Sequence, residues 1–178
     1  MKHLGTKTLE TPRLILRQFV IDDCELFYKN WASDERVTKY MTWDAHQNIE
    51  LTKMIVTDWV NNYVNDNFYQ WAIVLKETNE PIGSISVVRM DEETETFEIG
   101  YCLSYDYWNK GITSEAFKAV IKYAFEEIKI KVFAARHDER NIASGKVMEK
   151  CGLKYIGTKE DINKGENIIL KMYELKNN

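Results

Sequence analysis

The chain has 178 residues, of which 44% are hydrophobic and 29% are charged, and its formal net charge is -4. This length and composition suit one globular domain with a single core. An acidic chain has no general attraction for a phosphate backbone, so we expect no nucleic-acid partner. No apolar run approaches the roughly 20 residues that cross a bilayer, and the first residues lack the apolar core of a signal peptide. We therefore expect no membrane partner and a cytoplasmic location.

The cysteines and histidines show no metal-ligand spacing. Cys24, Cys102 and Cys151 lie far apart in the sequence without a C-x-x-C pair, and the three histidines are equally scattered. We therefore expect neither a disulfide framework nor a bound metal.

The first third of the chain predicts one strand and two helices. Residues 13–17 (RLILR) alternate and follow a proline, which is typical of an opening strand. Two aspartates then offer an N-cap for a helix over residues 24–33, and a second apolar stripe predicts a helix over residues 48–64. Residues 34–44, between them, are polar, aromatic and irregular.

The middle of the chain changes to β-rich runs. Residues 69–104 contain three of them, separated by ETNEP and DEETE, and predict an antiparallel meander. In the third run, alternate residues share a face. One face is apolar and the other is small and polar, with the members Phe97, Ile99, Tyr101 and Leu103 against Glu98, Gly100, Cys102 and Ser104.

The last third predicts two helices and three strands. Residues 116–128 carry a broad apolar stripe, and the strand over 131–137 follows this crossover helix, so it should pair in parallel with an earlier strand. Asn141 should cap a helix that ends before Gly152. Two strands around the turn NKGE close the chain. In total, the sequence predicts seven strands and four helices.

The stretch YWNKGITSEA, residues 107–116, has the character of an anion site. A loop with Gly111 precedes a helix whose first N–H groups are unpaired, and Lys110 adds a positive charge. Many helices begin after glycine, so a plain flexible helix entry is an equal alternative. The patterns G-x-G-x-x-G and G-x-x-x-x-G-K-[ST] are both absent, which argues against NAD and nucleoside triphosphates.

Three blocks in order carry a family resemblance: residues 9–41, 97–116 and 140–157. Together they resemble the GNAT superfamily of N-acetyltransferases, in the branch that contains the ribosomal-protein N-terminal acetyltransferases (RimJ/RimL-like). The resemblance implies a single domain over residues 1–178 with an α/β (α+β) fold. That fold is a mixed, mostly antiparallel seven-stranded sheet flanked by about four helices. It also implies acetyl-CoA as co-substrate and an amine as acceptor.

The same resemblance places the cofactor. The pyrophosphate loop of the family falls on residues 108–113, and the pantetheine arm runs beside residues 101–103. Asn141 matches a family asparagine near the cofactor, although it could serve only as an N-cap. Thr113 departs from the glycine or alanine that the family prefers. The implied cofactor contacts are Tyr101, Cys102, Leu103, Trp108, Asn109, Lys110, Gly111, Ile112, Thr113, Ser114, Asn141 and Ser144.

Two residues are predicted to be catalytic. Glu98 aligns with a glutamate that some GNAT enzymes use as a general base, and the alternative is a strand glutamate paired with a cation. Ser144 resembles a serine suggested as proton donor in the ribosomal-protein branch, because the usual tyrosine position holds Met148. Cys102 could be a nucleophile, but no histidine is predictably near it, so direct attack by the amine is favoured.

The acceptor stays open at this stage. A protein N-terminal amine leads, ahead of a small amine such as an antibiotic, polyamine or amino acid, and of a non-catalytic acyl-CoA-binding module. Either a monomer or a homodimer is expected. Candidates for an aromatic acceptor cleft are Trp31, Tyr40, Met41, Trp43 and Trp71, although aromatic residues at such spacings more often form core. Candidates for attracting an amine are Glu35, Asp44 and Asp161, with a solvated surface as the default alternative.

Overall fold

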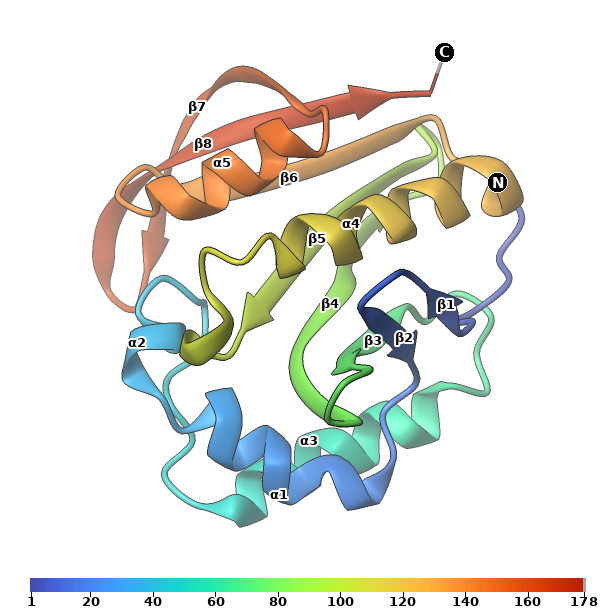
Figure 1. Ribbon diagram of the computed structural model, residues 1–178. Coiled ribbons are helices and arrows are strands. Elements are labelled where there is room, and N and C mark those ends of the chain that lie inside the picture. Colours follow the sequence, from blue (N-terminus) through green and yellow to red (C-terminus); the bar gives the residue numbers. More distant parts are fainter. Residues whose placement is uncertain (178) are drawn as a thin grey trace.

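The computed structural model describes residues 1–177 and shows one mixed sheet with helices on both faces (Figure 1). The strands run in the order β1-β2-β3-β4-β5-β6-β8-β7. Their bounds are β1 Leu9–Glu10, β2 Leu14–Arg17, β3 Gln70–Leu75, β4 Glu80–Asp91, β5 Thr96–Leu103, β6 Val132–Asp138, β7 Lys154–Asn163 and β8 Glu166–Lys176.

Five α-helices connect these strands. Their bounds are α1 Cys24–Phe27, α2 Glu35–Thr38, α3 Ile49–Asn62, α4 Ile112–Tyr123 and α5 Ile142–Lys150. A π-helical turn extends α1 to Ala32, and another extends α4 to Ile128. The cap predicted at Asn141 is present, since its side chain accepts from the Ser144 N–H, and Asn48 caps α3 in the same way through the Leu51 N–H.

Two apolar clusters hold the helices to the sheet. The larger lies between α4 and the strands, with Phe117 and Val120 against residues such as Ile99 and Phe133. The smaller lies under α1 and α3, on the face to which Cys102 points. Figure 1 shows α1 and α3 together at one end and α4 and α5 along the other part of the sheet. The alternation predicted for residues 97–104 is therefore confirmed, since each face meets its own cluster.

Within residues 1–177, only one neighbouring pair of strands is parallel. Thr96–Ile99 of β5 pair with Val132–Ala135 of β6, as the crossover over α4 predicts. Beyond Ile99 the ladder stops, although β5 continues to Leu103 and β6 to Asp138. The two strands therefore diverge at their carboxyl ends.

The fold class is confirmed, but the predicted numbers of strands and helices are wrong. The structure has eight strands and five helices within residues 1–177. The two elements that the sequence misses are β1, with two residues, and α2, with four residues inside the segment expected to be irregular. Neither is long enough to show a periodic pattern. Asp23 also does not cap α1, since its carboxylate accepts from the N–H of Val20 and binds Arg17.

Candidate functional site: a cleft between the diverging strands

A cleft of about 550 Å³ opens where β5 and β6 separate. Four segments line it: the end of β5, the loop into α4, the first turns of α5, and α2 with the residues that follow it. Its lining includes most of the predicted cofactor contacts, namely Tyr101, Cys102, Leu103, Trp108, Asn109, Gly111, Ile112, Thr113, Ser114, Asn141 and Ser144. Residues from three separate sequence blocks are thus brought to one place.

The loop before α4 presents unpaired backbone donors to this cleft. Asn109 and Gly111 have φ of 60° and 73°, and the left-handed Gly111 is the N-cap of α4. The first backbone N–H of α4 that has a hydrogen-bond acceptor is that of Glu115, which donates to Gly111 O at 3.1 Å. Within residues 1–177, the N–H groups of residues 112–114 have no acceptor. Three free donors at a helix N-terminus fit a phosphate group.

Lys110 is the one predicted cofactor residue that is not among those lining the cleft. Its ammonium lies 5.2 Å from the centre of the Tyr107 ring. Its carbonyl accepts from Arg13 Nη1 at 2.9 Å. In this arrangement the backbone of the loop, rather than this lysine, forms the cleft wall.

The start of α5 forms the opposite wall. The Asn141 side chain accepts from the Ser144 N–H at 3.3 Å, so it caps the helix as well as lining the cleft. The Ser144 hydroxyl lies 3.0 Å from the hydroxyl of Tyr101 on β5. Met148, at the position where the family commonly has a tyrosine, is 1% exposed and packs in the core.

Glu98 is buried and already has a cationic partner. Its carboxylate lies 2.8 Å from Arg136 Nε and 3.9 Å from Arg89 Nε, and its exposure is 9%. Arg136 also approaches Asp161, at 3.8 Å. Glu98 belongs to the polar face of β5 and is not among the residues that line the cleft. Its role as a base stays a prediction.

Cys102 has the surroundings of a protonated thiol. Burial raises its pKa, and its Sγ lies 3.3 Å from the hydroxyl of Ser84. A nucleophilic cysteine needs a lowered pKa and a base or cation close by. These surroundings argue against a nucleophilic role for Cys102.

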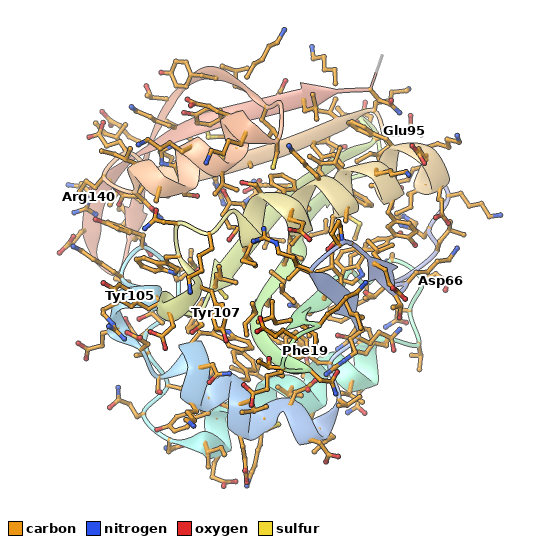
Figure 2. All side chains as sticks on the ribbon, viewed as in Figure 1. Phe19, Asp66, Glu95, Tyr105, Tyr107 and Arg140 are labelled. Carbon is orange, nitrogen blue, oxygen red and sulfur yellow. The ribbon has the colours of Figure 1, made fainter. Side chains whose placement is uncertain are left out.

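A further wall of the cleft comes from α2, the residues after it and the loop before α5. The lining residues here are Arg36, Val37, Tyr40, Met41 and Arg140. Each arginine is held by the aspartate two positions before it, through Asp34 and Asp138, and the Nη2 distance is 2.6 Å in both pairs. Figure 2 shows Arg140 near the start of α5 and Tyr105 on the side of α2. The repeated Asp-x-Arg is the signal that could have revealed both arginines.

The aromatic acceptor candidates divide into two groups. Tyr40 and Met41 line the cleft, whereas Trp31 and Trp71 are 0% exposed and belong to the two apolar clusters. Trp43 packs against the smaller cluster. For these two tryptophans the core alternative holds, and burial of their indole rings stabilises the two clusters.

Within residues 1–177, no three histidine, cysteine or carboxylate side chains come together as a metal site requires. No helix in the same range combines the length and hydropathy of a membrane span.

The cleft thus lies where a parallel strand pair diverges beside a helix start with three free N–H groups. The family model "Acetyltransferase (GNAT) domain" matches residues 13–154. The N-acetyltransferase p20 of Bacillus licheniformis is 30% identical over 171 residues, covering 94% of this chain and 93% of that protein. The chain therefore belongs to the GNAT family of N-acetyltransferases, which use acetyl-CoA.

Solved structures agree with this fold. The GNAT-family acetyltransferase of Bacillus anthracis has a TM-score of 0.85 at 29% identity, covering 96% of this chain and 99% of that one. The ribosomal-protein-S5-alanine acetyltransferase of Vibrio fischeri has a TM-score of 0.84 at 18% identity, covering 97% of each chain. The second likeness is one of fold alone.

Proposed function

We propose that the protein transfers the acetyl group of acetyl-CoA to the N-terminal α-amine of a protein, by direct attack of the amine on the thioester. One observation carries the proposal: three free N–H groups at the start of α4 lie beside the diverging ends of β5 and β6. The pyrophosphate would bind these N–H groups, and the pantetheine arm would lie along residues 101–103. Asn141 and Ser144 would contact the arm from α5.

An α-amine costs less to deprotonate than a lysine side chain, so it needs less help from the site. Deprotonation at neutral pH costs about 1.4 kcal/mol for an α-amine and about 4.6 kcal/mol for a lysine side chain. Glu98 pairs with Arg136 at 2.8 Å and does not line the cleft, so it would have to act as base through water. The oxyanion would be held by the main-chain N–H of Cys102 or Leu103. The fold likeness to a ribosomal-protein acetyltransferase points the same way.

A thiol-release assay with purified protein and acetyl-CoA tests the proposal. The acceptors are peptides that share one sequence with a lysine inside, either with a free N-terminus or with a formylated one. A panel of polyamines, amino acids and aminoglycosides is run beside them. We expect thiol release with the free N-terminus and none above background with the formylated peptide.

The other outcomes distinguish the alternatives. Release with the small amines and not with peptides would make the protein a small-molecule acetyltransferase. Binding of acetyl-CoA by calorimetry without release to any acceptor would favour a non-catalytic module. A monomer or homodimer, and a cytoplasmic location, remain our predictions.

A further inference from the structure

The hydroxyl of Tyr101 joins the two sides of the cleft where β5 and β6 have separated. Tyr101 projects from β5, and its ring lies 5.8 Å from that of Phe117 on α4. Its hydroxyl is 3.0 Å from the Ser144 carbonyl oxygen and 3.0 Å from Ser144 Oγ. Both Tyr101 and Ser144 line the cleft.

The proton count of this contact allows two arrangements. A phenol has one proton, and here it faces two acceptors on the same residue. If Tyr101 donates to the Ser144 carbonyl, Ser144 Oγ–H is free to donate to the phenol oxygen and points away from the cleft. If Tyr101 donates to Ser144 Oγ instead, the serine proton must point elsewhere, and the cleft is the side that remains open.

We infer that Tyr101 is a positioning residue that turns the Ser144 hydroxyl toward the sulfur of coenzyme A, so that the pair stabilises the departing thiolate. The inference rests on the proposed function, since it needs coenzyme A in this cleft. The neutral amine nitrogen bonds to the acetyl carbon and loses one N–H proton to water, the C–S bond breaks, and its electron pair moves to sulfur. Ser144 donates a hydrogen bond to that sulfur and keeps its proton, and the thiolate is protonated by water after release.

The phenol keeps its proton throughout. Burial raises the pKa of Tyr101 well above its usual range, and the hydrogen bond with Ser144 only partly opposes this. The titratable groups that face the phenol are Cys151 and Tyr173, and both of their pKa values are also raised by burial. A neutral donor in a buried position strengthens the hydrogen bond that its partner makes to an anion.

The thiol of bound coenzyme A reports this hydrogen bond without any acceptor. Its pKa is read from the ultraviolet absorbance of the thiolate across a pH series, with desulfo-coenzyme A as the blank, which cancels the signal of Cys102. A donor to the thiolate lowers its pKa, so we expect Tyr101→Phe and Ser144→Ala each to raise the pKa of the bound thiol. The expected rise is about half a unit to one unit.

Three further variants separate positioning from packing. The double variant should raise the thiol pKa no more than either single change, because the two hydroxyls act as one unit. Ser144→Thr keeps a hydroxyl and should return the pKa toward that of the wild type. Tyr123→Phe is the matched control, because its buried hydroxyl donates to Gly5 O at 2.8 Å, and the thiol pKa should not move.

An unchanged thiol pKa in folded Tyr101→Phe, or additive shifts in the double variant, would overturn the inference. If Tyr101→Phe fails to fold, Ser144→Ala and Ser144→Thr provide the test. An unchanged pKa of the bound thiol in Ser144→Ala would then overturn the inference. If the thiol of bound coenzyme A has the same pKa in every variant, this inference fails and the proposed function stands. Failure of the wild type to bind coenzyme A in calorimetry would defeat the proposed function as well.

Discussion

Gly111 is the residue whose backbone matters most to the cleft. Its φ of 73° lies in the left-handed region, where an L-residue is disfavoured by about 1 to 2 kcal/mol. We expect Gly111→Ala to lower the free energy of unfolding by about 1 kcal/mol and to weaken acetyl-CoA binding, because the strained loop can relax away from the phosphate geometry. Denaturant unfolding and titration calorimetry measure the two effects.

Gly165 provides the matched control for this change. It also has a left-handed φ, of 81°, but lies in the β7–β8 turn, where an added Cβ would meet nothing within 4 Å. Gly165→Ala should lose similar stability and bind acetyl-CoA like the wild type. Equal affinity in both alanine variants would mean that the geometry at Gly111 does not hold the cofactor.

At the residue scale, sequence reasoning found what local chemistry determines. Gly111 and Asn141 were predictable because a left-handed turn and an N-cap each favour few residue types. Arg36 and Arg140 escaped because their place in the cleft depends on how α2 and the loop before α5 meet. The partnership of Glu98 with Arg136 likewise depends on strand order.

Hydrogen bonds and an ion pair connect the first turn of α4 to the residues just before β2. The Glu115 carboxylate accepts from Thr11 Oγ1 at 2.6 Å and from Arg13 N at 2.9 Å, and it pairs with Arg13 Nε at 2.6 Å. Arg13 also donates to Lys110 O, so the same group of contacts holds the loop. Burial alone would raise the pKa of Glu115, but the hydrogen bonds from Thr11 and Arg13 hold it below its usual 4.5.

Folding lowers the pKa of Glu115, so its contacts with Thr11 and Arg13 are sensitive to acid. The contribution of Glu115 to stability is present above its unfolded pKa, near 4.5, and is lost as the pH falls through its lower folded pKa. We therefore expect Glu115→Gln to flatten part of the fall in the free energy of unfolding below about pH 4.5. Urea unfolding across a pH series, on wild type and variant, measures this. Parallel curves for the two proteins would show that the carboxylate contributes nothing there.

At the element scale, period and turn chemistry predicted most of the sheet. The parallel pairing of β5 with β6 followed from the crossover through α4. The point at which they diverge did not follow, because the ladder ends after Ile99 for reasons of non-local packing. For the same reason sequence could not show that Trp31 and Trp71 belong to the core rather than to the cleft.

Across the whole molecule, the β7–β8 hairpin meets the segment after α2 at one wall of the cleft. Near the β7–β8 turn, Asn163 donates to Met41 O at 3.2 Å, and Lys164 donates to Thr38 O at 3.0 Å. Lys164 also pairs with Asp44 at 3.0 Å. These contacts join the last hairpin to the segment that follows α2. The wall that would choose the acceptor is therefore built from segments more than a hundred residues apart.

A crystal structure with acetyl-CoA bound tests the central claim most directly. We expect the pyrophosphate oxygens within hydrogen-bonding distance of the N–H groups of residues 112–114, and the thioester between Ser144 and the main chain of residues 101–103. Cofactor bound elsewhere, or a pyrophosphate held by side chains away from the start of α4, would contradict the account.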